Sequence, residues 1–328
     1  MERVFSGMRP TGRLHLGHMA GALTNWVKLQ EDHECFYSIV DWHALMSDYA
    51  SPGLLAANTR EILLDWLAVG LDPEKSVIFV QSHVTQHVEL HMALSMIAPL
   101  GWLERNPTYK DQIRNLQNKD LSTYAFLGYP VLQAADILVY KARKVPVGED
   151  QSAHLELSRE IARRFNNFYG EIFPEPQTIL TPTPKIPGTD GRKMSKSYGN
   201  SLDIADEIPA LEKRIRTMMT DPARERRTDP GDPDKCPVWD LHKFFNGDAA
   251  QMDEIAQGCR TAGIGCIDCK KMLIAHVAEQ MEPIQERRRR FENSSDDLAD
   301  ILRAGADRAR EVAGATMDEV YGALSFLR

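Results

Sequence analysis

The chain has 328 residues, of which 43% are hydrophobic and 26% are charged, and its formal net charge at pH 7 is −8. This length predicts two domains, and the composition is that of an ordinary water-soluble protein. No apolar run approaches the roughly 18 residues of a membrane-spanning helix, and the N-terminal residues are unlike a secretion signal. We therefore expect a cytoplasmic protein that spans no membrane. The acidic balance excludes a histone-like polycation but leaves room for nucleic acid bound at local basic patches.

The first half of the chain alternates between apolar strands and patterned helices. The predicted strands are residues 3–7, 35–42, 76–82 and 145–148. The predicted helices are residues 18–30, 52–69, 87–98, 129–142 and 149–165, with a polar segment over 104–122. Such alternation is typical of a parallel sheet with right-handed crossovers. The sequence thus predicts an α/β, Rossmann-like domain.

The pattern changes after residue 173. Five prolines between residues 174 and 187 predict a linker, and a glycine-flanked loop follows it. Beyond Leu202 the strand signals end and the sequence is typical of helices. We therefore expect an α/β domain over 1–187 and a loop with a mainly α-helical domain over 188–328.

A His-Leu-Gly-His motif, His15 to His18, lies between the first predicted strand and the helix that follows. Ligands of open α/β sheets bind at the carboxyl ends of the strands, where a helix N-terminus offers free N–H groups to phosphate. Gly17 allows a nucleotide to approach the backbone closely, and the imidazoles offer N–H donors to a reacting phosphate. The alternative is a surface turn with incidental histidines.

A second motif, Lys193-Met194-Ser195-Lys196-Ser197, lies in the glycine-flanked loop. Two lysines three residues apart in a loop are suited to neutralising a triphosphate and the pyrophosphate that leaves it. A solvated basic loop is the ordinary interpretation of a Lys-Ser stretch. That interpretation explains this pentapeptide poorly when it accompanies His-Leu-Gly-His on an α/β domain.

Together the two motifs resemble the paired signatures of class I aminoacyl-tRNA synthetases. Residues 5–12, 129–140, 145–166 and 193–197 resemble the bacterial tryptophanyl-tRNA synthetases more specifically. The resemblance implies that L-tryptophan attacks the α-phosphate of ATP, giving tryptophanyl-adenylate and pyrophosphate, and that tRNA(Trp) then accepts the tryptophanyl group. It also implies Mg²⁺ carried with the ATP, an anticodon-binding helical domain and a homodimer.

The resemblance also assigns residues to the ATP site. It places ATP against Arg9, Pro10, Thr11, Gly17, His18, Gly148, Glu149, Asp150, Lys193, Met194, Ser195, Lys196 and Ser197. It gives catalytic roles to His15, His18, Lys110, Lys193 and Lys196. Two positions depart from the family pattern, since Arg9 stands where relatives often have Gln and Gln133 where many bacterial members have Met.

Asp136 is an unusual residue for the otherwise apolar helix predicted over 129–142. The indole of tryptophan has one polar atom, an N–H that only donates, so a selective pocket needs a buried acceptor. The resemblance assigns this role to Asp136 and the rest of the pocket to Tyr129, His43, Gln133 and Gln151. The alternatives are an exposed or capping aspartate and a core histidine at position 43. The alternative function is that of a tyrosyl-tRNA synthetase of the same class.

Four of the five cysteines, Cys236, Cys259, Cys266 and Cys269, have the spacing C-x22-C-x6-C-x2-C, while Cys35 lies in a predicted core strand. In a reducing cytosol such crowding favours a metal site over disulfides. Four thiolates suit either a [4Fe–4S] cluster or tetrahedral Zn²⁺. The resemblance favours the cluster, because a subset of tryptophanyl-tRNA synthetases carries such cysteines with one. Four unligated core thiols are the plain alternative.

Two further functions would keep part of this pattern. A small-molecule nucleotidyltransferase would share the fold without binding tRNA, and the long helical tail argues against it. A non-catalytic, metal-sensing RNA-binding protein would use the four cysteines, and the two intact motifs argue against that.

Overall fold

The computed structural model describes all residues except 108, 111–120, 149–151, 181–185 and 328. Its strands are β1 (Arg3–Met8), β2 (Glu34–Ile39), β3 (Ser76–Val80), β4 (Lys144–Val147) and β5 (Gln177–Leu180). The helices of the first half are α1 (Leu16–His18), α2 (Thr24–Leu29), α3 (Asp41–Asp48), α4 (Leu55–Val69), α5 (Gln86–Ser95), α6 (Leu100–Arg105), α8 (Tyr124–Leu138) and α9 (Ser152–Tyr169). Those of the second half are α10 (Ile208–Thr217), α11 (Pro237–Phe245), α12 (Ala249–Arg260), α13 (Cys266–Glu292) and α14 (Ser295–Ala323).

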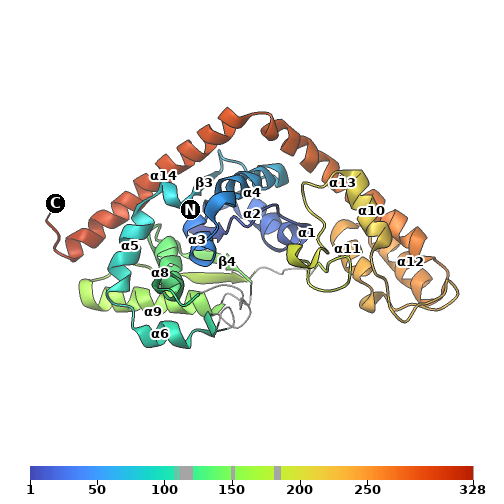
Figure 1. The fold of residues 1–328 in the computed structure, drawn as a ribbon, viewed down its shortest axis with the longest axis horizontal. Helices are drawn as coiled ribbons and strands as arrows, with labels where there is room; N and C mark the ends of the chain where they lie inside the picture. The colour runs from blue at the N-terminus through green and yellow to red at the C-terminus, as the bar shows by residue number, and fades with distance from the viewer. Residues whose placement is uncertain (108, 111–120, 149–151, 181–185, 328) are drawn as a thin grey trace.

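The five strands form one parallel sheet in the order β3-β2-β1-β4-β5 (Figure 1). The central strand β1 pairs with β2 on one side and with β4 on the other, so the strand order reverses between β1 and β4. Ligands of open α/β sheets bind in the crevice at such a reversal, outside the carboxyl ends of the strands. The predicted parallel α/β fold, followed by helices, is confirmed.

The sequence analysis missed β5. Gln177–Leu180 lies in the stretch predicted as a linker, yet it pairs in parallel with Lys144–Val147 along its whole length. Four residues between two prolines are too few to show an apolar pattern, and the strand exists because β4 offers it an edge. The linker prediction is therefore wrong for these residues. Most of the polar segment over 104–122 lies outside the described residues.

Aromatic side chains dominate both faces of the sheet. On one face Trp26 of α2 stacks on Tyr37 of β2, with ring centroids 4.6 Å apart. On the other face Tyr140, just after α8, stacks on Phe36 of β2 at 4.6 Å. Cys35 is buried among these residues, as predicted. The first of the two cores continues into α10, α11 and α13, so the sheet and the helical segment share buried apolar surface.

The C-terminal helix α14 returns to the sheet and lies along its edge strand β3 (Figure 1). A Cβ atom at position 305 would stand 1.8 Å from the carbonyl oxygen of Ile78, so this close approach requires Gly305. Arg308 and Arg310 of the same helix donate to the carbonyl groups of Pro73 and His83, at 3.0 and 2.9 Å. Because an uncovered edge strand is a template for association with other chains, α14 protects the sheet.

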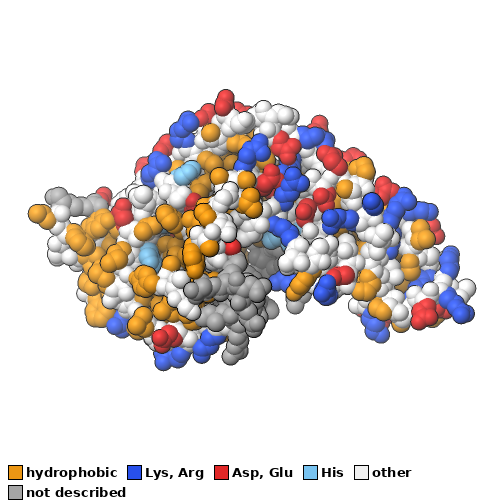
Figure 2. Space-filling model, viewed as in Figure 1, with side chains coloured by type: hydrophobic (Ala, Val, Ile, Leu, Met, Phe, Trp, Pro, Cys, Tyr) orange, Lys and Arg blue, Asp and Glu red, His pale blue; other side chains and the backbone are white. Residues whose placement is uncertain are grey.

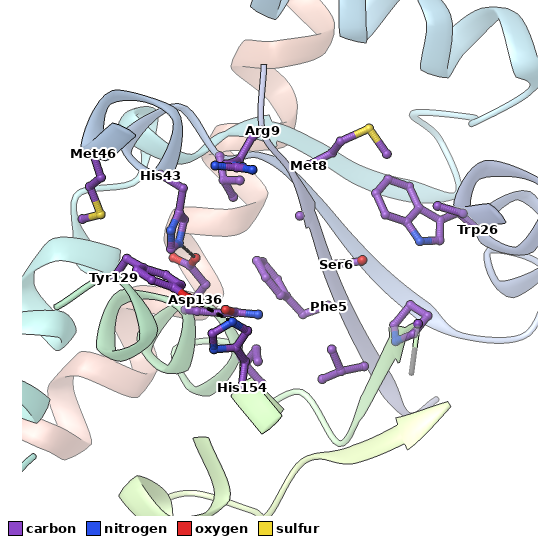
Figure 3. Close-up of a pocket in the computed structure, with 18 of the residues that line it drawn as sticks. Phe5, Ser6, Met8, Arg9, Trp26, His43, Met46, Tyr129, Asp136 and His154 are labelled. Carbon is purple, nitrogen blue, oxygen red and sulfur yellow. Dashed lines mark hydrogen bonds and ion pairs between the residues drawn. The ribbon is translucent and has the colours of Figure 1, made fainter. Parts of the chain in front are cut away.

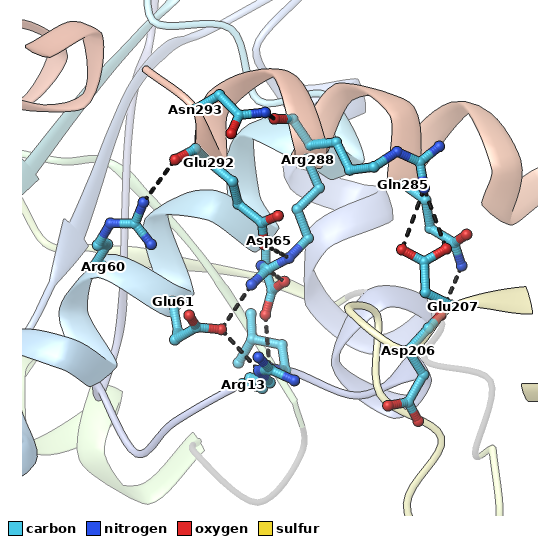
Figure 4. A network of polar contacts seen from close by, with 12 residues as sticks. Arg13, Arg60, Glu61, Asp65, Asp206, Glu207, Gln285, Arg288, Glu292 and Asn293 are labelled. Carbon is cyan, nitrogen blue, oxygen red and sulfur yellow. Dashed lines mark hydrogen bonds and ion pairs between the residues drawn. The ribbon is translucent and has the colours of Figure 1, made fainter. Parts of the chain in front are cut away.

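A buried ionic network joins α13 to α4 (Figure 4). The side chain of Arg288 is 4% exposed, and its guanidinium donates to the carboxylates of Asp65 and, at 2.7 Å, Glu61. The second oxygen of Asp65 accepts the backbone N–H of Leu14 at 2.7 Å. Arg288 of the helical segment therefore fixes the loop that leads directly into the His-Leu-Gly-His motif.

The surface is unevenly polar. Figure 2 shows apolar side chains gathered over the part of the molecule that carries α5, α6 and α9. The exposed apolar residues here include Val88 and Met92 of α5, Met96 directly after it, Leu100 of α6 and Phe168 of α9. Large apolar patches on soluble proteins mark sites of association. Within the described part of the chain, no helix combines the length and the apolar character needed to cross a membrane.

Replacing Arg288 by methionine should strongly destabilise the fold, because Asp65 would stay buried without its charged partner. Breaking a buried pair in this way costs about 3–5 kcal/mol. Arg289 is the matched control, since its pair with Glu207 is exposed on both sides, 52% and 62%. Arg289→Met should cost less than about 1 kcal/mol. Urea unfolding followed by circular dichroism measures both, and equal free energies of unfolding for the two variants would contradict the role given to Arg288.

Candidate active site

A cavity of about 360 Å³ opens at the carboxyl ends of β1 and β4, where the strand order reverses (Figure 3). Its apolar walls include Phe5 and Met8 of β1, Trp26 of α2, Phe126 of α8 and Val145 of β4. This volume and this mixture of aromatic and aliphatic walls suit a small ligand with an aromatic side chain. Six residues predicted for the site line it: Arg9, His43, Tyr129, Gln133, Asp136 and Gly148.

Asp136 is the polar centre of this cavity. The residue is 1% exposed, which excludes the alternative of a surface or capping aspartate. Its Oδ2 lies 2.8 Å from His43 Nε2, and its Oδ1 lies 2.7 Å from both His87 Nδ1 and Gln81 Nε2. Burial by itself would raise the pKa of this carboxyl, but the hydrogen bonds from His43 and His87 hold that pKa below its ordinary value. Asp136 is thus an ionised acceptor inside an apolar helix.

A hydrogen-bonded pair of polar side chains, Tyr129 of α8 and His154 of α9, also lines the cavity. The hydroxyl of Tyr129 lies 3.1 Å from His154 Nε2, and His154 Nδ1 lies 3.2 Å from the amide of Asn106. The structure brings Tyr129 to the cavity as predicted, with the half-buried Gln133 beside it. The sequence analysis missed His154, although its place on the apolar face of a helix beside the predicted Gln151 was a signal.

The His-Leu-Gly-His motif forms the start of the first helix. His15 caps α1, and its ring lies against that of His18 with centroids 3.8 Å apart. The backbone N–H of His15 donates to His18 Nδ1 at 3.2 Å. A Cβ atom on residue 17 would stand 3.0 Å from two atoms of the His15 ring, so Gly17 makes room for this ring. The two histidines are therefore held as a pair and are not incidental to a surface turn.

Both imidazoles of the motif are neutral at neutral pH. Burial, together with the charge of Lys196, lowers the pKa of His15 to about 4. Burial and the neighbouring His15 lower the pKa of His18 to about 3. His15 Nδ1 is buried and has no hydrogen-bond partner among the described residues. An anionic ligand would supply that partner.

The second motif contacts both the first motif and the loop that precedes it. Lys196 Nζ donates to the carbonyl of Thr11 at 3.0 Å, and Met194 is buried in the core against Gly17. Lys193 is exposed. This arrangement aims one lysine at the loop after β1 and leaves the other free to approach a ligand.

Asn200 organises the loop, and the sequence analysis did not single it out. Its Oδ1 accepts the Ser195 N–H at 2.8 Å, and its Nδ2 donates to Asp190 at 2.7 Å. The hydroxyls of Ser195 and Ser197 lie 2.8 Å apart in the same turn. Asn200 is 2% exposed, so the loop is anchored at a buried amide.

Backbone pairing joins the first motif to residues 202–204, which follow the second motif. The N–H of Leu16 donates to the carbonyl of Leu202 at 2.8 Å, and the N–H of Ile204 donates to the carbonyl of Leu14 at 2.9 Å. His15 forms the antiparallel bridge between these bonds with Asp203. Segments almost 190 residues apart in the sequence thus build one site by pairing as short extended strands.

The remaining predicted positions divide into three groups. Arg9, Pro10 and Thr11 form the loop after β1, where Arg9 lines the cavity and Pro10 is buried. Lys110 is exposed. Glu149, Asp150 and Gln151 lie outside the described residues, although their neighbour Gly148 lines the cavity.

The four clustered cysteines come together from three helices. Cys236 precedes α11, Cys259 lies in α12, and Cys266 and Cys269 lie in the first turn of α13. Burial and the charges of the other three thiols raise the pKa of Cys269 to about 12, so Cys269 lies within electrostatic reach of the other three. In the described ranges, however, no three His, Cys, Asp or Glu side chains are placed to hold a metal ion.

Comparison with known proteins agrees with this geometry. The family model described as class I tRNA synthetases (W and Y) matches residues 1–282. The chain belongs to this family. The synthetase is 54% identical over 326 residues to the tryptophan–tRNA ligase of Thermotoga maritima, across 99% of both chains. It is 45% identical over 392 residues to that of Aquifex aeolicus, across 98% of this chain and 99% of the relative.

The fold of the synthetase is similar to that of a solved relative. The crystal structure of tryptophanyl-tRNA synthetase from Campylobacter jejuni, complexed with ADP and tryptophan, matches it with a TM-score of 0.89 at 34% identity. The match covers 99% of this chain and 100% of that one. The predicted family and fold class are therefore confirmed.

Proposed function

We infer that this synthetase is a tryptophan–tRNA ligase. It activates L-tryptophan with ATP to tryptophanyl-adenylate and pyrophosphate, and it transfers the tryptophanyl group to tRNA(Trp). The observation that carries this inference is Asp136, an ionised acceptor buried in a cavity with aromatic walls beside the two paired motifs. The Thermotoga maritima and Aquifex aeolicus relatives, both tryptophan–tRNA ligases similar over nearly their full length, support the same activity over that of a tyrosyl enzyme.

We propose that ATP lies between the two motifs, with its Mg²⁺ bound to the phosphates. A carboxylate oxygen of tryptophan attacks the α-phosphorus, the bond to the β-phosphate breaks, and pyrophosphate leaves. His15 and His18 offer N–H donors to the phosphates, and Lys193 and Lys196 neutralise the charge of the departing pyrophosphate. The chain supplies position and electrostatic stabilisation, and no covalent intermediate with the enzyme is needed.

The proposed ATP site extends beyond these four side chains. The nucleotide would also contact residues of the loop after β1, residues that follow β4 in the sequence, and the second motif. These residues are Arg9, Pro10, Thr11, Gly17, Gly148, Glu149, Asp150, Met194, Ser195 and Ser197. Lys110 would reach the phosphates from the segment before α8. The charge of Arg9 and the placement of Gly148 on the cavity wall support this assignment.

The proposed tryptophan site occupies the cavity itself. Asp136 would accept the indole N–H, and Gln151 would contact the amino group. His43, Tyr129 and Gln133 line the same space. Since indole carries a single donor, one ionised acceptor in an apolar wall provides both orientation and selectivity.

We propose that residues 1–187 form the catalytic domain that binds ATP and tryptophan. Residues 188–328 then supply the Lys193–Ser197 loop and the helical domain that receives the anticodon of the tRNA. The same proposal places the synthetase in the cytoplasm as a homodimer. The apolar surface over α5, α6 and α9 supports the dimer, because exposed patches of this kind mark association sites.

We propose further that Cys236, Cys259, Cys266 and Cys269 hold a [4Fe–4S] cluster, with Zn²⁺ as the alternative. Cys269 lies within electrostatic reach of the other three thiols, and four cysteine thiolates are a donor set that either metal centre accepts. The buried guanidinium of Arg224 lies 3.9 Å from Cys259 Sγ and would offset the negative charge of a thiolate-bound cluster. The four cysteines lie outside the catalytic sheet, so a cluster there would brace the anticodon surface and take no part in adenylate formation.

Asp136→Asn should reduce the selectivity for tryptophan over phenylalanine while the fold persists. The substitution removes the charge that accepts the indole N–H, and loss of a charged hydrogen bond costs about 1.5–3 kcal/mol. Amino-acid-dependent pyrophosphate exchange measures kcat/KM for both amino acids, and thermal unfolding reports on the fold. Unchanged selectivity in a folded variant would remove Asp136 from the tryptophan site.

Lys193→Ala and Lys196→Ala should each lower kcat for adenylate formation on the order of 10²-fold and leave tryptophan binding almost unchanged. The physical reason is that the lysines act on charge that develops as pyrophosphate leaves. Pyrophosphate exchange gives kcat, and equilibrium dialysis gives the affinity for tryptophan. Lys213→Ala on α10 is the control and should behave as the wild type. A change confined to the KM for tryptophan would show that the loop has another task.

Cys266→Ser should abolish the brown colour of an iron–sulfur protein and weaken tRNA binding, while tryptophan-dependent pyrophosphate exchange persists. Cys35→Ala is the control, because Cys35 is buried in the sheet core and should leave both colour and tRNA binding intact. Anaerobic purification, visible absorption, metal analysis and filter binding of tRNA make the measurements. A colourless wild type with one zinc per chain would contradict the iron, and a coloured Cys266→Ser protein would exclude this ligand.

A further inference from the structure

Two donors to Asp136 belong to residues outside the cavity. His87 and Gln81 are fully buried and are absent from the cavity wall, in contrast to His43. Both bind the same carboxylate oxygen, Oδ1, at 2.7 Å. They cannot touch a ligand, so their effect on one must pass through Asp136.

The hydrogen bonds of His87 form a directed chain. A carboxylate only accepts, so the Nδ1–H of His87 donates to Asp136. In a neutral imidazole the other nitrogen then accepts, and Tyr140 O–H, 2.7 Å from His87 Nε2, is its donor. With His87 neutral, the order is Tyr140 to His87 to Asp136, and both donors point toward the carboxylate.

The two oxygens of Asp136 differ in what they can still accept. Each carboxylate oxygen has two lone pairs. Oδ1 receives His87 and Gln81, so both of its positions are filled. Oδ2 receives His43, which itself lines the cavity, and among the described residues it has no second donor. One acceptor position remains, on the oxygen that is shared with a residue of the cavity wall.

We propose that His87, oriented by Tyr140, and Gln81 are positioning residues that set the selectivity for a ring N–H. They saturate Oδ1 and fix the plane of the carboxylate, so the free lone pair of Oδ2 points into the cavity and accepts the indole N–H of tryptophan. This proposal rests on the proposed function, because it requires an aromatic amino acid with a ring donor as the substrate.

The residues packed around Tyr140 and His87 keep this series of hydrogen bonds rigid. Gln81 directly follows β3, His87 lies in the first turn of α5, and Tyr140 follows α8. The ring of Tyr140 stacks on Phe36 and packs edge-on against Phe79, with centroids 4.6 and 5.7 Å apart. Close-packed aromatic walls of this kind leave the hydroxyl one orientation toward His87.

A plain structural role would give a different result from a positioning role. If His87 and Tyr140 only filled the core, their loss would weaken every substrate of the cavity equally. If they orient the carboxylate of Asp136, their loss should lower kcat/KM for substrates with a ring N–H and leave kcat/KM unchanged for substrates without one. The probe is therefore a pair of substrates, L-tryptophan and its benzothiophene analogue, in which sulfur replaces the indole N–H.

The test measures the ratio of kcat/KM for tryptophan to that for the analogue in pyrophosphate exchange. Tyr140→Phe should lower this ratio about three- to tenfold, because one neutral hydrogen bond is lost. His87→Leu should lower it about 10- to 100-fold, because a bond to a charged group is lost. His87→Asn should recover most of the ratio, since its amide N–H stands close to the position of Nδ1.

Tyr37→Phe is the matched control. Tyr37 is an equally buried tyrosine of the sheet whose hydroxyl donates to the carbonyl of Trp26, not to the Asp136 cluster. The ratio of kcat/KM for tryptophan to that for the analogue should be the same in Tyr37→Phe as in the wild type. Should His87→Leu fail to fold, Tyr140→Phe carries the same comparison with the loss of a single oxygen atom.

The outcomes separate this proposal from the function on which it rests. A wild type that uses tryptophan but does not discriminate it from the analogue would overturn both the acceptor role of Asp136 and the positioning role of His87. A wild type that discriminates, with Tyr140→Phe and His87→Leu either unchanged or lowering both substrates by one factor, would overturn the positioning role alone. A ratio that falls in these two variants and returns in His87→Asn is the result we expect.

Discussion

The buried ion pair between Arg288 and Asp65 is the contact on which the geometry of the active site depends. Taking two charges out of water is costly, and the pair persists because Arg288 also reaches Glu61 and Glu292 while Asp65 accepts the Leu14 N–H. Apolar residues at these positions would let α13 slide over α4. The charges specify a single crossing point, and through Leu14 that point sets where the first motif begins.

A second buried carboxylate, Asp136, is stabilised in the opposite manner. It has no arginine or lysine partner among the described residues, and two histidines and an amide supply its hydrogen bonds. Without a fixed cation, the carboxylate keeps a negative charge that a ligand donor can share. The charge of Asp65 is neutralised by Arg288, whereas one acceptor position of Asp136 has no donor among the described residues. This difference distinguishes a structural carboxylate from the proposed ligand-binding one.

The sequence predicts what is local and repeated. Long apolar runs gave β1, β2 and β3, and a single charge in an apolar helix singled out Asp136. The sequence analysis missed β5 because four residues are too few to show an apolar periodicity. The strand with which β5 pairs also lies 33 residues earlier in the sequence. The sequence analysis also missed His87 and Tyr140, because their hydrogen bonds toward Asp136 form only when the fold brings α5 and the end of α8 together. The roles assigned to the ATP-binding residues stay predictions, because they are supported only by the family resemblance and by the closeness of the two motifs in the structure.

The two halves of the proposed reaction depend on the fold in different ways. The proposed tryptophan cavity lies between the two cores, with Phe5 and Val145 from one and Trp26 from the other, and its polar centre Asp136 lies on α8. The proposed phosphate site lies where residues 14–16 pair with residues 202–204, and that pairing places a loop of the second half against the first helix. Any shift of the helical segment therefore alters the lysines and histidines around the phosphates before it alters Asp136. The hydrogen bonds around Asp136 come from residues of the first half alone, whereas the proposed chemistry on ATP is coupled to the helical segment through Arg288 and Leu14.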